Sequence, residues 1–73
     1  MIRFRLNGEI REARDSLSLR ELLSELNLPE VGVAVAVNDA VIPRGDHPAT
    51  ILRDNDVVEI IHAVGGGGWM FMR

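Results

Sequence analysis

The sequence predicts one small α+β domain, in which a mixed sheet of four to five strands is crossed by one main helix. Three observations predict this class. Apolar segments with strand-like patterns lie near both ends and in the middle of the chain, one leucine stripe with helical spacing lies between them, and turn residues separate them. A chain of 73 residues has room for one such domain and no second one.

The N-terminal segment predicts a β-hairpin. Apolar residues alternate with arginines over residues 2–6, which is the pattern of a half-buried strand. Asn7 and Gly8 follow, and this pair is the strongest two-residue hairpin signal because both turn positions need a positive φ. Residues 9–14 return as a second strand. It is polar enough to lie at a sheet edge, with Ile10 as its apolar anchor.

A capped helix is predicted next. Ser18 and Glu21 have the spacing of a capping box, in which each residue satisfies a backbone amide of the other. The apolar stripe that follows the i, i+3, i+4, i+7 rule consists of Leu19, Leu22, Leu23 and Leu26. Pro29 ends the pattern, so we expect a helix of roughly two to three turns that needs packing on the sheet to be stable.

Two strands and an irregular connection follow the helix. Residues 33–37 are apolar on both faces, which predicts a central strand covered by the helix. Residues 41–42 predict a short strand that a proline stops, and residues 43–53 an irregular connection in which His47 is a solvated loop residue.

The last predicted strand comprises residues 57–61. The turn before it contains Asp54 and Asp56, and the turn explains both without a cation site. The resulting order of elements is the β-grasp arrangement of ubiquitin, with the first and last strands side by side in the centre. His62 is interpreted as a plain histidine at the strand end, because no partner at metal-ligand spacing accompanies it.

The last strand predicts a docking surface. If Val58 and Ile60 point into the core, the alternate side chains face outward, and exposed apolar residues on a small sheet often mark a partner site. These outward residues are Val57, Glu59 and Ile61. The alternative is a face that the neighbouring strands partly cover.

Composition argues against several function classes. The net charge of −3 argues weakly against nucleic acid as a partner. The chain has no Cys, no nucleophile–base pair and no metal cluster, which argues against an enzyme or a metal site. No apolar segment has the length of a membrane span and no secretory signal is present, so we expect a cytoplasmic location and no membrane partner.

The glycines at residues 65–68 are the feature that predicts chemistry. They lack the spacing of a phosphate-binding loop, and we expect them to form a flexible arm beyond a domain of residues 1–64. A glycine arm can thread a narrow channel, and its terminal carboxylate can attack the α-phosphate of ATP if an enzyme supplies the catalytic groups. The protein is then a carrier and co-substrate, with no catalytic residue of its own.

From about Leu6 to Gly67 the chain resembles the ThiS family of ubiquitin-like sulfur carriers. The matching segments are Asn7-Gly8, Leu19 to Leu23, Val35 to Asn38, Val41 to Arg44, Arg53 to Ile60 and Ala63-Val64-Gly65-Gly66-Gly67. The resemblance implies adenylation of the terminal glycine by a ThiF-like enzyme that uses ATP and Mg²⁺. Sulfur from cysteine, delivered through a desulfurase, then forms a thiocarboxylate, which a ThiG-like thiazole synthase consumes in thiamine biosynthesis.

Carried over by position, the thiocarboxylate site is Gly67 or Gly68, and Gly65 and Gly66 thread into the partner enzyme. No cofactor or metal is implied for the carrier itself. The sequence departs from the family in two places: Asn55 stands where the family usually has Gly, and residues 69–73 follow the glycines.

The C-terminal extension, Trp69 to Arg73, has three interpretations. Because a peptide-linked glycine has no free carboxylate, we hypothesise a removable segment that a processing protease trims. The alternatives are a tail added in cloning and a membrane or partner anchor. Two further functions also stay open. One is a sulfur carrier for molybdopterin, amino-acid or metabolite sulfuration, and the other is a ubiquitin-like binding or modifier domain.

Overall fold

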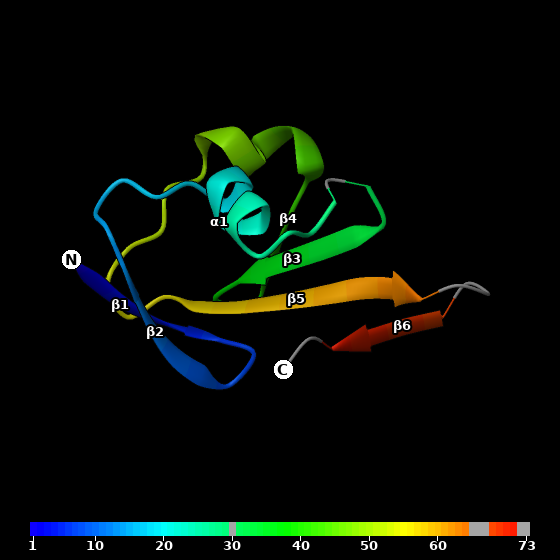
Figure 1. The fold of residues 1–73 in the computed structure, drawn as a ribbon, viewed down its shortest axis with the longest axis horizontal. Coiled ribbons are helices and arrows are strands. Elements are labelled where there is room, and N and C mark those ends of the chain that lie inside the picture. Colours follow the sequence, from blue (N-terminus) through cyan, green and yellow to red (C-terminus); the bar gives the residue numbers. More distant parts are fainter. Residues whose placement is uncertain (30, 65–67, 72–73) are drawn as a thin grey trace.

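The computed structural model describes residues 1–29, 31–64 and 68–71. Within these residues the chain forms a six-stranded sheet in the order β2-β1-β5-β3-β4, with β6 added beside β5. Figure 1 shows the helix α1 and the 3-10 helix η1 together on one face of this sheet. The elements are β1 (Ile2–Leu6), β2 (Glu9–Ala13), α1 (Leu19–Glu25), β3 (Val33–Val37), β4 (Ala40–Ile42), η1 (Arg44–Ala49), β5 (Val57–Val64) and β6 (Gly68–Phe71).

The β-grasp prediction is confirmed. β1 pairs in parallel with β5 through Arg5 and Val57, so the first strand and the last predicted strand lie side by side in the sheet. No helix within the described part of the chain is long and apolar enough to cross a membrane.

The N-terminal hairpin forms as predicted except for the place of Ile10. Asn7 and Gly8 both have positive φ, 48° and 87°, as the predicted two-residue turn requires. Ile10 is 61% exposed and does not anchor β2 in the core. Its partner across the ladder is Arg5, which lies on the face away from α1. Ala13 is the residue of β2 that packs against the core.

The capping box at the start of α1 is confirmed. The Glu21 amide donates to Ser18 Oγ at 3.1 Å, and the Ser18 amide donates to Glu21 Oε1 at 3.0 Å. Because these bonds satisfy two amides at the helix start, they fix the point at which the chain turns towards the core.

The helix ends earlier than Pro29. Asn27 adopts a positive φ of 59°, and the Leu28 amide donates to the carbonyl of Leu23 at 2.9 Å. This is the bond of a Schellman motif, which stops a helix through one left-handed residue. The helix therefore ends at Glu25, and its stop signal is the asparagine rather than the proline.

Glu21 predicts a pH dependence of stability. The hydrogen bonds from the Ser18 backbone and side chain, and then the nearby Arg14, lower the pKa of Glu21 below its ordinary value of 4.5. A lowered pKa means that this carboxylate stabilises the folded chain fully above pH 4.5 and stops doing so as the pH falls through the folded pKa. We expect Glu21→Gln to lose less stability than the parent on acidification below that value. Thermal unfolding at stepped pH measures this, and equal losses in both chains would contradict it.

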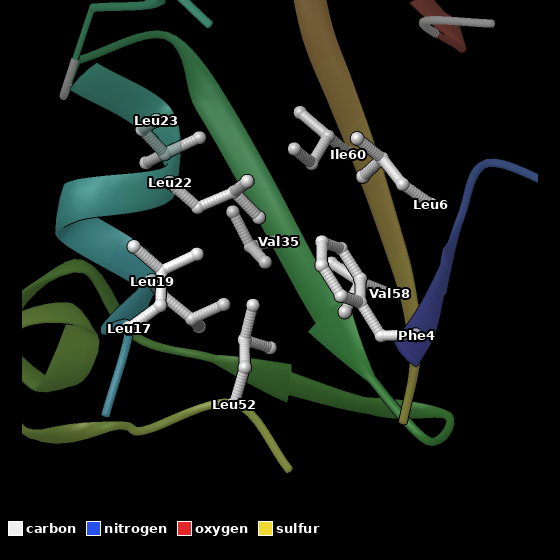
Figure 2. Close-up of a cluster of buried hydrophobic side chains, with 10 residues drawn as sticks. All are labelled: Phe4, Leu6, Leu17, Leu19, Leu22, Leu23, Val35, Leu52, Val58 and Ile60. Carbon is white, nitrogen blue, oxygen red and sulfur yellow. The ribbon is translucent and has the colours of Figure 1, made fainter. Parts of the chain in front are cut away.

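The core lies between the sheet and α1. Figure 2 shows leucines of α1 facing Val35 of β3 and the side chains of β1 and β5. Val58 and Ile60 of β5 are 0% and 1% exposed. The buried apolar residues are Phe4, Leu6, Leu17, Leu19, Leu22, Leu23, Val35, Leu52, Val58 and Ile60.

The expectation that His47 is a solvated loop residue is wrong. Residues 44–49 form the 3-10 helix η1, which packs against α1, and His47 within it is 3% exposed. Its Nε2 lies 3.0 Å from the carbonyl oxygen of Ile42. The ring is therefore a structural group that ties η1 to the end of β4.

Candidate functional site

β5 carries the candidate site because it leads directly into the glycine tail. The strand lies between β1, to which it is parallel, and β3, to which it is antiparallel. It continues to Val64, three residues beyond the predicted end at Ile61. The residue after Val64 is Gly65, so the tail leaves the domain from the end of a strand that is fixed on both sides at its start.

The predicted alternation along β5 is confirmed by burial. Val57 is 42% exposed and Glu59 and Ile61 are half-buried, whereas Val58 and Ile60 are fully buried. On β3, Ala34 lies opposite Ile61 and Ala36 lies opposite Glu59. Because alanine side chains are short, the longer side chains of Glu59 and Ile61 project beyond them on this face of the sheet. Docking on this surface stays a prediction.

The turn before β5 is held by its own side chains. Asp54 Oδ1 accepts a hydrogen bond from the Arg3 amide at 2.8 Å, and Asp56 accepts from the Arg53 amide at 2.8 Å and from Asn38 Nδ2 at 3.0 Å. These bonds confirm the turn interpretation of both carboxylates. Among the described residues, no group of three or more His, Cys, Asp or Glu side chains is suited to hold a metal ion.

Asn55 fits its position in the same turn. It has a φ of 70°, and its amide donates to the Arg3 carbonyl at 2.7 Å. Asparagine tolerates this left-handed backbone better than other residues with a Cβ, so the departure from the family's usual glycine leaves the turn intact.

Asn7 performs a second role that its turn position does not reveal. Its side-chain Oδ1 accepts from the Ile60 amide at 2.8 Å, and its Nδ2 donates to the Ile60 carbonyl at 3.4 Å. The side-chain amide thus acts as one further residue of the ladder beyond the end of β1. It satisfies the backbone of β5 between the part that pairs with β1 and the part that pairs with β6.

A strand that the sequence did not predict, β6, begins at the last glycine of the tail. β6 pairs antiparallel with the end of β5, and Gly68 lies opposite Val64. Gly68 was predicted to belong to a flexible arm, and within the structure it begins β6 instead. Trp69 lies opposite Ala63 in the same ladder. The other predicted tail residues, Gly65, Gly66 and Gly67, lie outside the described residues.

Comparison with known proteins points to one family. A family model described as the ThiS family matches residues 4–67, so the match covers most of the chain and ends before β6. The sulfur carrier protein ThiS of Thermus thermophilus is 39% identical over 62 residues, which are 85% of this chain and 95% of that protein. A thiazole synthase of Magnetococcus marinus is 38% identical over 66 residues, 90% of this chain, and the chain spans 20% of that protein's length.

The fold has a solved counterpart. The crystal structure of the thiamine biosynthesis protein ThiS from Geobacter metallireducens matches with a TM-score of 0.76 and 33% sequence identity. The match covers 90% of this chain and all of that chain, 100%.

Proposed function

The chain belongs to the ThiS family, and on this premise we propose that it is a sulfur carrier of thiamine biosynthesis. Family members of this kind are small carrier proteins rather than enzymes. The observation that carries the proposal is the family match over residues 4–67, which includes the domain and the glycines that follow β5. The tail, and not a pocket in the domain, is the reactive part.

The proposed chemistry takes place at the carboxylate of Gly67. A ThiF-like adenylating enzyme binds ATP and Mg²⁺, and the carboxylate attacks the α-phosphate to form an acyl adenylate with release of pyrophosphate. A persulfide, formed from cysteine on a desulfurase, then displaces AMP through its terminal sulfur to give an acyl disulfide, and a thiol reductant cleaves the S–S bond to leave the thiocarboxylate. The carrier contributes the carboxylate and the shape of its tail, and the partner supplies the groups that stabilise the developing charge.

This chemistry requires that the residues after the terminal glycine are removed. In the full-length sequence the carbonyl of Gly67 is part of a peptide bond and cannot be adenylated. Two observations favour Gly67 over Gly68 as the mature terminus: the family match ends at residue 67, and Gly68 is paired within β6. We propose that a protease cuts between these two glycines.

The proposed acceptor of the sulfur is a thiazole synthase. The thiazole synthase of Magnetococcus marinus contains a region that resembles this chain, and a carrier joined to a synthase in one polypeptide suggests that the two act in sequence. The region is a small part of that protein, so the rest of the polypeptide carries the synthase.

Genetic complementation tests the pathway. We expect a chain that ends at Gly67 to restore growth without thiamine to a bacterial strain that lacks its own ThiS carrier. A chain that ends at Val64 is the control, because it keeps β5 and lacks the tail. Failure to restore growth by a carrier that is charged in vitro would reject the thiamine pathway. It would favour sulfuration of another metabolite.

Ile61→Arg tests the proposed docking surface. Ile61 is half-buried on the outward face of β5, three residues before the end of the strand. We expect the charge to weaken binding to the adenylating enzyme by about tenfold or more, because the loss of a central anchor at an interface costs about 2 kcal/mol or more. Calorimetric titration of the chain that ends at Gly67 measures the affinity.

The matched control for this surface is Val41→Arg. Val41 is 73% exposed on β4, at the far edge of the same sheet. We expect it to leave the affinity unchanged. Equal affinities for both variants and the parent would remove the face of β5 from the interface.

A further inference from the structure

One edge of β5 has three different backbone partners in succession along its length. At its start β1 supplies the partner, and the Asn7 amide donates to the Val58 carbonyl at 2.9 Å. At Ile60 the side-chain amide of Asn7 supplies both hydrogen bonds. Beyond Ile60 the partner is β6. Only the last of these three occupants belongs to a segment that the proposed processing removes.

Backbone alternation identifies which groups β6 covers. Val58 and Ile60 direct their backbone groups towards β1 and Asn7, whereas Val57 bonds with Asn38 on the side of β3. Successive residues of a strand direct these groups to opposite sides, so His62 and Val64 present theirs on the same edge as Ile60. In the ladder with β6 these two residues lie opposite Met70 and Gly68.

We propose that this edge of β5, at His62 and Val64, is a docking site for an extended strand. β6 fills the site within the full-length chain. After the extension is removed, an extended segment of the enzyme that receives the glycine tail takes its place. The inference rests on the proposed function for the identity of that enzyme, and on the geometry of β5 for the site.

Two arguments favour a strand as the occupant. The first is that β6 already occupies the edge as an antiparallel strand, which shows that the backbone there is accessible and correctly twisted for pairing. The second is continuity. Val64 is joined directly to Gly65, so a protein that encloses the tail also surrounds this edge. Strand addition to a free sheet edge is a common mode of peptide recognition, because main-chain hydrogen bonds supply the affinity.

β6 and the partner segment exclude each other, because one edge pairs with one strand at a time. The extension therefore blocks the carrier twice: it converts the carboxylate of Gly67 into an amide, and it covers the docking edge. A cut between Gly67 and Gly68 opens both features in one step. Coupling the two ensures that the enzyme engages only chains whose tail can react.

Amide hydrogen exchange, followed residue by residue by NMR, tests the site directly. We expect the amide of His62 to be protected in the full-length chain, to exchange fast in the chain that ends at Gly67, and to be protected again in the complex with the adenylating enzyme. Ile61 is an internal control in the same strand. Its amide faces β3, where Ala34 is its partner, so it stays protected in all three states.

A proline variant tests the same edge by activity. In the chain that ends at Gly67, His62→Pro removes the amide that faces the edge and leaves the bonds to β3 in place. We expect KM for the carrier in the adenylation reaction to rise by about tenfold, the effect of one lost hydrogen bond of about 1.4 kcal/mol. Ile10→Pro is the matched control, because Ile10 lies on the edge strand β2, separated from β5 by β1, and its amide faces away from β1. It leaves KM unchanged.

The outcomes separate this inference from the proposed function. If the chain that ends at Gly67 is charged while His62 exchanges fast in the complex, the docking site is overturned and the carrier function stands. Fast exchange of His62 in the full-length chain would overturn the role of β6. If no adenylating enzyme charges any form, the carrier function fails. If His62→Pro does not fold, Val64→Pro takes its place, because the Val64 amide faces the same edge. The hydrogen-exchange measurement uses the unsubstituted chain and depends on neither variant.

Discussion

The chain that ends at Gly67 is expected to gain the mass difference between one sulfur and one oxygen atom when it is incubated with ATP, Mg²⁺, a ThiF-like enzyme and a sulfur source. The full-length chain is expected to gain nothing, because its Gly67 carbonyl lies within a peptide bond. The effect is all or none, since adenylation requires a free carboxylate and no other group of the chain replaces it. Intact mass spectrometry of both forms measures it.

A chain that ends at Gly68 is the matched control for this experiment. It also has a free glycine carboxylate, but its tail is one residue longer. We expect slower charging, because the adenylating site must place the carboxylate next to the α-phosphate of ATP and a small misplacement costs rate steeply. Equal charging rates for the chains that end at Gly67 and at Gly68 would show that the adenylating enzyme does not discriminate between the two termini. A gain on the full-length chain would refute the need for trimming.

Ile60→Ala is expected to have the largest effect on stability. Ile60 is 1% exposed, and loss of a buried isoleucine side chain costs about 2–5 kcal/mol. A domain of this size has a total stability of about 3–5 kcal/mol, so a large fraction of the variant is unfolded in the absence of denaturant. Urea unfolding followed by circular dichroism measures the loss.

Ile10→Ala is the control for that loss, because it removes the same atoms from a side chain that is 61% exposed. Its expected effect is within about 0.5 kcal/mol. If both substitutions cost the same, the assignment of Ile60 to the core and of Ile10 to the opposite face would be wrong.

Most of the fold is predictable from the sequence because its signals are local. The turn at Asn7 and Gly8 needs only two residues of the right backbone preference, and the capping box of Ser18 and Glu21 needs only their spacing. The errors concern residues whose surroundings are set by distant segments. His47 is buried because η1 packs against α1, and no local pattern reports that contact.

The candidate site was also predicted only where its signals are local. The alternation of Val57, Glu59 and Ile61 along β5 is a local pattern, and the structure has it. The bonds between Asn7 and Ile60 join residues that are 53 positions apart, and a hairpin turn gives no sign of them. β6 was missed because a strand of four residues has no stability alone. It exists only because β5 continues to Val64 and offers it an edge.

The place of β5 in the sheet also determines when the chain can fold during its synthesis. β5 lies between β1 and β3 and contributes Val58 and Ile60 to the core, yet it follows both of these strands in the chain. Until β5 has emerged from the ribosomal exit tunnel, β1 and β3 have no strand between them. The core of the nascent domain therefore closes only after β5 has left the tunnel. Contacts between such distant residues also make the domain fold more slowly than a helical bundle of its size.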